Sequence, residues 1–366
     1  MKYSLFALLC SSLITFLVVR FEHLHGHVSA DHDLNGIQKF HAVPVPRIGG
    51  VGIHSSLLLT ALLLRAANSI HSHFILIFLI PSSLVFAIGF TEDLTKRVSV
   101  TMRLVVTMLA ALIGCLILNT TVRTFGIPMI DTLFQINLIA LVFTVVAVAG
   151  VSNAINLIDG FNGLAAFVSV TALVALAVVA HIVGDELIFT IALTTAGAVV
   201  GFLIWNYPTA KIFLGDGGAY LVGFVIAELS ILLHERNAEV SVLFPLLLMI
   251  YPIFETLFSI YRRKFVRGQS PGAPDAMHLH QMINKRLVRW RVACDGVSIR
   301  SRGNAKTSPY LWALNLSAVI PAVVFWNNAW MLFIFIILFV VLYVWLYFCI
   351  VRFRTPRLLI LSVKRH

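Results

Sequence analysis

The sequence is poor in charged residues: Asp, Glu, Lys and Arg make up only 12% of its 366 residues, about half the share found in soluble domains. Hydrophobic residues make up 59% of the chain, and the mean hydropathy is +0.94. Such a composition excludes a soluble globular domain. It indicates an integral membrane protein that crosses the bilayer several times.

Cysteine is also scarce. The four cysteines are Cys10, Cys115, Cys294 and Cys349. They have no paired spacing, which argues against a structural disulfide or a zinc site. The sequence contains no internal repeat, and its one long extramembrane segment, residues 261–308, is too short and too basic to bury its own core. We therefore expect residues 1–366 to form a single membrane domain.

The apolar runs set the expected fold. A hydrocarbon core of about 30 Å requires about 20 apolar residues per helix, and this rule predicts an all-α protein with about 11 transmembrane helices. The predicted spans are residues 3–21, 50–67, 73–90, 103–118, 135–150, 163–182, 187–205, 219–233, 240–260, 309–326 and 329–350.

The distribution of basic residues sets the expected orientation. An odd number of spans divides the loops into two sets, and all but four of the 27 Lys and Arg residues fall in one set. The positive-inside rule assigns that set to the cytoplasm, so the N-terminus is predicted outside and the C-terminus inside. The alternative is a signal peptide ending at Val28-Ser29-Ala30. It is disfavoured because cleavage would export nearly all the basic loops.

The polar motifs all fall in the predicted cytoplasmic loops. These loops are residues 22–49, 91–102, 151–162, 206–218 and 261–308. Polar side chains at a membrane boundary cost free energy unless they face water, a metal or a polar ligand, so a functional site is the default hypothesis there. We expect the five loops to form the active-site face.

The first motif is a pair of adjacent acids, Glu92 and Asp93, followed by Lys96 at the inner end of the third span. Neighbouring carboxylates repel each other, which favours a bound divalent cation or a shared proton. In isolation, such a pair is equally typical of a solvated helix end.

The second motif places Asp216 between glycines, just before the eighth span. Glycine lets the backbone approach a phosphate closely, and the following helix directs its N-terminal N–H groups at an anion. Because Mg²⁺ typically takes one or two carboxylates plus substrate oxygens, this arrangement predicts a magnesium ion shared with a pyrophosphate. A lone Gly-Asp-Gly-Gly would indicate only a turn.

Two further motifs carry polar side chains. Asn153, Asn156 and Asp159 recur every third residue, which on a helix places them on one strip facing one ligand; helix capping would explain only one of them. His278 and His280 point the same way on an extended segment, which suits phosphate or metal contacts. The separate histidines near the N-terminus, His23, His25, His27 and His32, are interpreted as a solvated loop.

Taken in order, these motifs resemble the polyprenyl-phosphate N-acetylhexosamine-1-phosphate transferase superfamily, of glycosyltransferase family 4 type. The resemblance covers nearly the whole chain. It rests on the Pro-Arg-x-Gly-Gly segment with Arg47, Gly49 and Gly50, the acidic pair with Lys96, the NxxNxxDGxxGL stretch from Asn153 to Leu164, FxGDxG with Phe213 and Asp216, and the pair His278 and His280.

The resemblance implies transfer of a sugar 1-phosphate from a UDP-sugar to undecaprenyl or another polyprenyl phosphate, with release of UMP. It implies a Mg²⁺ cofactor, replaceable by Mn²⁺, with Asp216 and Asp93 as metal ligands. Glu92, Asp93 and Asp159 would be catalytic, with Glu92 or Asp93 handling the lipid phosphate. The implied substrate-binding residues are Arg47, Lys96, Asn153, Asn156, Asn162, Phe213, His278 and His280, with Phe213 stacking on uracil.

Departures from the family pattern bear on specificity. Glu92 stands where the family usually has aspartate, which leaves open which of the two acids is essential. Asn162 stands where aspartate is common. The His278 segment lacks the third histidine and following acid of the phospho-N-acetylmuramoyl-pentapeptide transferase branch. We therefore expect an enzyme of the bacterial inner membrane that initiates O-antigen, capsule or exopolysaccharide synthesis.

Other classes were weighed against this interpretation. A transporter places ionisable residues near the bilayer midplane, but only Glu228 and Glu255 fall inside predicted spans. A CDP-alcohol phosphotransferase needs closely spaced aspartates, and none follows Asp159 until Asp185. A non-catalytic relative stays open. The expected partners are the UDP-sugar, the polyprenyl phosphate and membrane lipid, without nucleic acid; a homodimer is left open.

Overall fold

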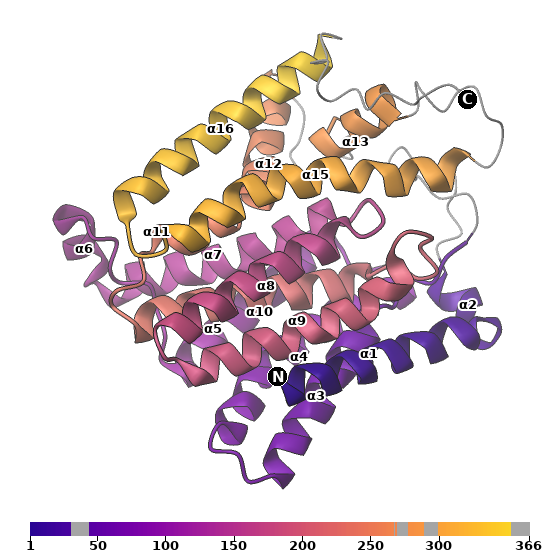
Figure 1. The fold of residues 1–366 in the computed structure, drawn as a ribbon, viewed down its shortest axis with the longest axis horizontal. Coiled ribbons are helices and arrows are strands. Elements are labelled where there is room, and N and C mark those ends of the chain that lie inside the picture. Colours follow the sequence, from indigo (N-terminus) through magenta and orange to yellow (C-terminus); the bar gives the residue numbers. More distant parts are fainter. Residues whose placement is uncertain (31–43, 267, 269–276, 289–298, 353–366) are drawn as a thin grey trace.

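The computed structural model describes residues 1–30, 44–266, 268, 277–288 and 299–352. Within these ranges the chain is helical and forms no strand, only an isolated bridge between Ala30 and Pro46. Figure 1 shows the helices packed as one bundle. The helices are α1 (Lys2–Arg20), α2 (Glu22–Ser29), α3 (Gly50–Ala66), α4 (Ser72–Thr95), α5 (Val100–Leu118), α6 (Pro128–Phe134), α7 (Asn137–Ile158), α8 (Leu164–Ile182), α9 (Glu186–Asn206), α10 (Gly215–Arg236), α11 (Leu243–Leu248), α12 (Ile250–Tyr261), η1 (Arg262–Val266), α13 (Leu279–Ile283), η2 (Asn284–Val288), α15 (Ile299–Val324) and α16 (Ala329–Val351).

The expectation of an all-α polytopic membrane protein is confirmed. In the described ranges, nine helices are long and apolar enough to cross a membrane, and each coincides with a predicted span. A tenth predicted span is α3, whose 17 residues extend about 25 Å. The eleventh, residues 240–260, is divided into α11 and α12.

The division of the ninth predicted span has a local cause. The helix breaks at Met249, between Leu248 and Ile250. Pro252 cannot donate a hydrogen bond to the Leu248 carbonyl, and its ring clashes with that carbonyl in a regular helix. The prediction of one continuous helix from 240 to 260 was therefore wrong.

Several predicted loops are partly helical. Helices α4 and α7 continue to Thr95 and Ile158, and α10 begins at Gly215. The polar motifs therefore sit on helix ends, which hold side chains more rigidly than loops do. The N-terminal histidines also differ from the prediction, because His23, His25 and His27 lie on α2; His32 lies outside the described residues.

Helix α10 is the central helix of the bundle (Figure 1). Its membrane-spanning window is completely buried, and it packs against α3, α4, α5, α7, α8 and α9. A helix that is buried on all sides must be apolar all round, and α10 satisfies this except at its two ends, at Glu228 and at Ser230, whose hydroxyl donates to the Ile226 carbonyl. Its first turn is consequently fixed by neighbours on every side.

Glycines allow this first turn to approach its neighbours closely. A Cβ atom on Gly89 of α4 would lie 2.6 Å from the Cα atom of Gly217, and one on Gly50 of α3 would overlap the backbone of Gly218. Gly215 has a φ of +76°, a conformation that glycine adopts without strain. These glycines explain how three helices converge at the start of α10.

We predict that Gly89→Ala destabilises the protein, because the added methyl group has no space between α4 and α10. Overpacking of this kind costs about 1–3 kcal/mol. The measurement is the thermal unfolding midpoint of the purified protein in detergent, which should fall. The control is Gly150→Ala on α7, where a Cβ atom meets nothing within 4 Å; that midpoint should stay equal or rise, since alanine favours helices. Equal midpoints for both variants would contradict the prediction.

Candidate functional site

Two motifs that are far apart in sequence meet through their backbones. The Phe213 N–H donates to the Pro46 carbonyl at 2.8 Å, and the Phe213 carbonyl accepts from the Gly49 N–H at 2.9 Å. Phe213 is half-buried. These bonds join the segment before α3 to the segment before α10, and they place Arg47 beside the first turn of α10.

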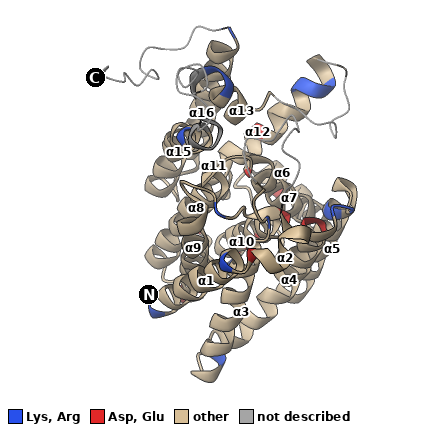
Figure 2. Ribbon diagram, turned by 90° about the vertical axis from the view of Figure 1, so that its right-hand side faces the viewer, with Lys and Arg blue, Asp and Glu red and all other residues tan. Residues whose placement is uncertain are grey.

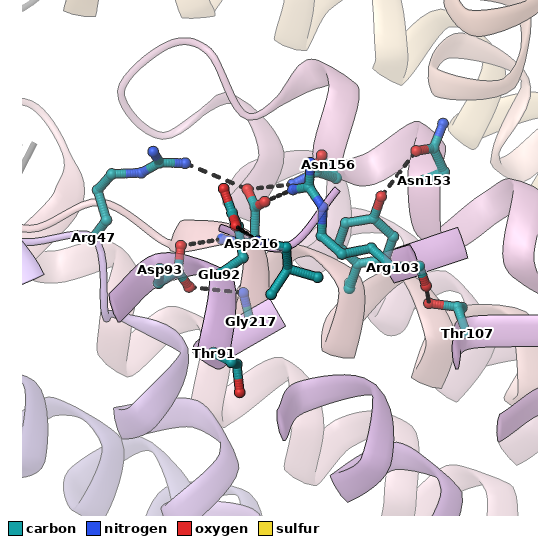
Figure 3. Close-up of polar contacts among 12 residues, drawn as sticks. Arg47, Thr91, Glu92, Asp93, Arg103, Thr107, Asn153, Asn156, Asp216 and Gly217 are labelled. Atoms are coloured by element: carbon teal, nitrogen blue, oxygen red, sulfur yellow. Dashed lines mark hydrogen bonds and ion pairs between the residues drawn. The ribbon is translucent and has the colours of Figure 1, made fainter. Parts of the chain in front are cut away.

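Asp93 caps this first turn. Its Oδ1 accepts the backbone N–H of Asp216 and its Oδ2 accepts that of Gly217, both at 2.8 Å (Figure 3). The first N–H groups of a helix have no partner within the helix, and the positive end of the helix dipole attracts a carboxylate. Asp93 is only 2% exposed. Its position therefore fixes α4 to the start of α10.

Asp216 is the centre of the polar cluster. Its Oδ1 accepts hydrogen bonds from Asn156 Nδ2 at 3.0 Å and from an Arg47 guanidinium nitrogen at 3.3 Å. Its Oδ2 forms an ion pair with Arg103 of α5. Figure 3 shows the side chains of Arg47, Asn156 and Arg103 pointing toward Asp216. The site thus combines residues of α5, α7, α10 and the segment before α3.

Arg103 was not predicted as a site residue, although the sequence carried a signal for it. It is the only charged residue in the 19 residues of α5, and a charge within an apolar span is a functional candidate. Asn153, predicted to bind substrate, instead accepts a hydrogen bond at 3.0 Å from the Tyr220 hydroxyl. The Arg103 guanidinium lies 5.8 Å from the centre of the Tyr220 ring.

The adjacent acids face different partners. Glu92 accepts the Val98 N–H at 2.7 Å and so holds the turn between α4 and α5, whereas Asp93 faces α10. The described contacts therefore give the two carboxylates no shared ligand. Lys96 ends α4 in the left-handed conformation, and its Nζ donates to the Ala30 carbonyl at 3.1 Å, so it ties the end of α2 to the site.

Asp159 follows the last residue of α7, and its carboxyl group has no hydrogen-bond partner among the described residues. The residue is only partly shielded from solvent, but the protein atoms packed around its carboxyl raise its pKa well above the usual value. The positive charge of Arg47 opposes this increase in pKa, and the negative charge of Asp93 adds to it. Asp159 is thus a carboxyl group open to a ligand.

Asn162 lies apart from the cluster. Its Nδ2 donates to the Pro208 carbonyl, and its backbone N–H donates to Asn304 Oδ1, both at 2.9 Å. Its carbonyl accepts from the Ser308 hydroxyl, and the residue is 2% exposed. Asn162 therefore joins the start of α8 to α15, and its contact with substrate stays a prediction.

The two histidines lie at the start of α13, with parallel rings whose centres are 5.2 Å apart. His278 Nδ1 lies 3.1 Å from Glu255 Oε1 of α12, and Glu255 also accepts from the Tyr343 hydroxyl at 2.8 Å. A Cβ atom on Gly160 would lie 3.6 Å from His280 Nε2. Glu255, which the sequence argument did not assign to the site, thus orients the histidines beside the Asp159 segment.

The donor set suits a hard divalent cation. In the described part of the chain, no three His, Cys, Asp or Glu side chains converge as a preformed cage. However, Mg²⁺ typically uses one or two carboxylates and takes its other ligands from phosphates and water. Asp216 has already attracted two guanidinium groups, which shows that its carboxylate is a strong site for positive charge. The residues present therefore fit Mg²⁺ or Mn²⁺.

An apolar cavity of about 210 Å³ opens between α7, α10 and the broken helix pair α11 and α12. The lining runs from Val122 and His234 to Val151 and Ile253. Because α7 ends at Ile158, close to Asp159, the Val151 end of this cavity points toward the polar cluster. Figure 2 looks onto the end of the bundle that carries the cluster, with acidic positions near its middle and basic positions around them.

We predict different costs for neutralising the two adjacent acids. Asp93→Asn removes a charge that accepts two backbone N–H groups, each such bond contributing about 1.5–3 kcal/mol, so the unfolding midpoint in detergent should fall by several degrees. Glu92→Gln retains an oxygen for the Val98 N–H and should change the midpoint little. An equal or larger effect of Glu92→Gln would contradict the capping role of Asp93.

Comparison with known proteins supports a common origin for this site. Residues 75–234, which run from α4 to α10, match the sequence profile of glycosyl transferase family 4. The matched region contains Glu92, Asp93, Arg103, Asn156 and Asp216. Arg47 and the two histidines of α13 lie outside it.

Individual relatives match shorter stretches. The chain is 37% identical over 108 residues to a probable undecaprenyl-phosphate N-acetylglucosaminyl 1-phosphate transferase of Bacillus subtilis, covering 29% of this chain and 30% of that protein. It is 33% identical over 96 residues to an undecaprenyl-phosphate α-N-acetylglucosaminyl 1-phosphate transferase of Thermotoga maritima, covering 26% and 31%. It is 37% identical over 115 residues to a decaprenyl-phosphate N-acetylglucosaminephosphotransferase of Mycolicibacterium smegmatis, covering 27% and 28%. The matched stretches thus span less than a third of each relative.

The family match includes the helices α4, α5, α7 and α10 that build the Asp216 cluster, and the Arg47 segment outside it joins the start of α10 through backbone hydrogen bonds. Residues 75–234 therefore carry the sequence profile of glycosyl transferase family 4, and over less than a third of its length the chain is similar to polyprenyl-phosphate N-acetylglucosamine-1-phosphate transferases.

Proposed function

We propose that the protein transfers an N-acetylhexosamine 1-phosphate, with N-acetylglucosamine 1-phosphate the leading candidate, from its UDP-sugar to a polyprenyl phosphate. The relatives' names specify that sugar and that class of acceptor. The observation that carries the proposal is Asp216, held by two guanidinium groups and an amide at a helix N-terminus.

The reaction follows from the two substrates. An oxygen of the polyprenyl phosphate attacks the phosphorus that carries the sugar. A new P–O bond forms, the bond to the uridine-linked phosphate breaks, and UMP leaves with the electron pair. Direct attack is our hypothesis, because positioning and electrostatic stabilisation provide most of the catalysis in phosphoryl transfer and no enzyme adduct is required.

The cationic groups would reduce the repulsion between the two anionic substrates. Arg47 and Arg103 lie at Asp216 and are the cationic side chains of the cluster. Phosphate oxygens bind well to guanidinium groups because the donor is charged and planar. A bound Mg²⁺ would add charge neutralisation at the diphosphate, with Asp216 as its principal protein ligand and Asp159 within the same cluster.

The apolar cavity provides a place for the isoprenoid chain. Its walls come almost entirely from aliphatic and aromatic side chains of α7, α10, α11 and α12. A polyprenyl chain gains about 0.8 kcal/mol per buried CH₂ group when it leaves water. The membrane offers the same gain, so we expect the cavity to align the acceptor and to add little affinity. Its phosphate would then lie near Asp159.

The apolar helices and the bacterial relatives indicate where the protein is located. The chain is a multi-pass membrane protein with bacterial relatives. For the orientation, we propose that the site faces the cytoplasm of the bacterial inner membrane, because the basic loops lie on the same side as the site. We further propose a role at the first step of O-antigen, capsule or exopolysaccharide synthesis, on the basis of the short histidine motif.

We predict that the purified protein in detergent releases UMP from one UDP-N-acetylhexosamine only when polyprenyl phosphate and Mg²⁺ are present. Asp216→Ala should abolish release, because it removes the centre of the cluster. The control is Glu186→Ala, which removes an exposed acid at the first residue of α9, the end of that helix away from the site. This variant should leave release unchanged. Donors with GlcNAc, GalNAc and their 6-deoxy relatives are compared. Lipid-independent release, or no release with any donor, would contradict the proposal.

We also predict that Asp159 accepts the proton of the polyprenyl phosphate. A carboxyl with a raised pKa is protonated at low pH, so base activity is full above its pKa and is lost as pH falls through that raised value, not near the usual 3.8. Asp159→Asn should lower kcat by about 100-fold or more and should remove this acid limb from the pH profile. An unchanged acid limb in the variant would assign the titration to the lipid phosphate.

A further inference from the structure

The ion pair between Arg103 and Asp216 is the least expected contact of the site. Asp216 is the residue that we propose as the principal metal ligand. In the structure, one of its two carboxylate oxygens is already paired with the guanidinium group of Arg103. The side chains of Arg103 and Asp216 are only 12% and 9% exposed. A like charge at the same oxygen would repel an incoming metal ion. Arg103 and the metal therefore compete for Asp216.

Arg103 also has unused hydrogen-bonding capacity. A guanidinium group has five N–H donors and can bind a phosphate through two of them at once. The Arg103 Nε is buried and has no hydrogen-bond partner in the described part of the chain. Leaving a buried donor of a charged group unpaired costs free energy. The arrangement at Asp216 is thus incomplete, and an anion with several oxygens would satisfy more donors.

The surroundings hold the guanidinium near this position. The Tyr220 ring lies 5.8 Å from the guanidinium carbon, within the range of cation–π attraction. Tyr220 is fixed in turn by its hydroxyl, which donates to Asn153 Oδ1 at 3.0 Å. Asn153 is a turn before Asn156 on α7, and Asn156 itself donates to Asp216. One face of α7 therefore positions both sides of the ion pair.

We propose that Arg103 is a diphosphate-binding residue which, without substrate, occupies Asp216 in competition with the metal ion, and that Tyr220 and Asn153 position it between the two partners. This inference rests on the proposed function. When a diphosphate binds, its oxygens take the guanidinium group and Asp216 becomes free for the metal. Metal and diphosphate should therefore bind cooperatively, each increasing the affinity for the other by the same factor.

The experiment measures binding and requires no turnover. Free Mn²⁺ is measured by electron paramagnetic resonance during titration of the purified protein in detergent, with and without saturating UDP. UDP binding is measured by calorimetry at fixed Mn²⁺. The variants are Arg103→Ala, Arg103→Lys and Tyr220→Phe. The matched control is Arg97→Ala, which removes an exposed positive charge near the same helix end and does not contact Asp216.

The expected result is a pair of opposite shifts. Arg103→Ala should tighten Mn²⁺ binding in the absence of UDP by about fivefold or more, weaken UDP binding, and reduce the cooperativity between them. Arg103→Lys retains a competing charge, so its Mn²⁺ affinity should stay near wild type while UDP binding remains weaker. Tyr220→Phe keeps the ring and loses the bond to Asn153, so it should give smaller shifts in the same directions. Arg97→Ala should behave as wild type.

Other outcomes separate this inference from the proposed function. Weaker binding of both Mn²⁺ and UDP in Arg103→Ala, or no change in either, would overturn the inference, since a purely structural arginine would have such effects. If wild-type protein binds no UDP but Arg103→Ala still tightens Mn²⁺ binding, the competition at Asp216 stands, whereas the diphosphate role and the proposed function fail. If the wild type binds UDP and releases UMP while Arg103→Ala shows wild-type affinities, only the inference fails.

Discussion

The structure depends on the two hydrogen bonds from the first turn of α10 to the Asp93 carboxylate. They satisfy two helix N–H groups that would otherwise lie unpaired in a buried position. They also join α4 to the central helix at the point where Asp216 leaves the backbone. Asp216 lies in this first turn. Any movement of the turn would therefore move the carboxylate that contacts Arg47, Asn156 and Arg103.

The site is a balance of charges more than a preformed cage. Asp216 faces two guanidinium groups and an amide, and the carboxyl group of Asp159 lies nearby without a hydrogen-bond partner among the described residues. Such a cluster can exchange its internal cation partners for a metal ion and an anionic substrate with little net change in charge. The glycines at positions 50, 89, 217 and 218 make the cluster possible, because they let α3 and α4 approach α10 closely enough for their polar ends to meet.

Much of the fold could be predicted from the sequence, because hydrophobic length alone determines where a chain can cross a membrane. Ten of the eleven predicted spans coincide with single helices, and the exception at Met249 arises from Pro252, whose effect on the helix is local. The helix ends were harder to place. The predicted loop bounds included Asn153, Asn156, Glu92 and Asp93, because polar composition marks both loops and the ends of helices, and the structure places all four on helix ends.

The sequence by itself determined the class of protein, the polar motifs and their grouping on one face, since composition and charge asymmetry need no contacts to be interpreted. The tertiary structure decided what each polar residue does. It assigned Asp93 to helix capping, Asn162 to a contact with α15, and Asn153 to the support of Tyr220. It also brought Arg103 and Glu255 into the site. The physical reason is that a side chain's role depends on its neighbours in space, and these lie as many as 169 residues away along the chain.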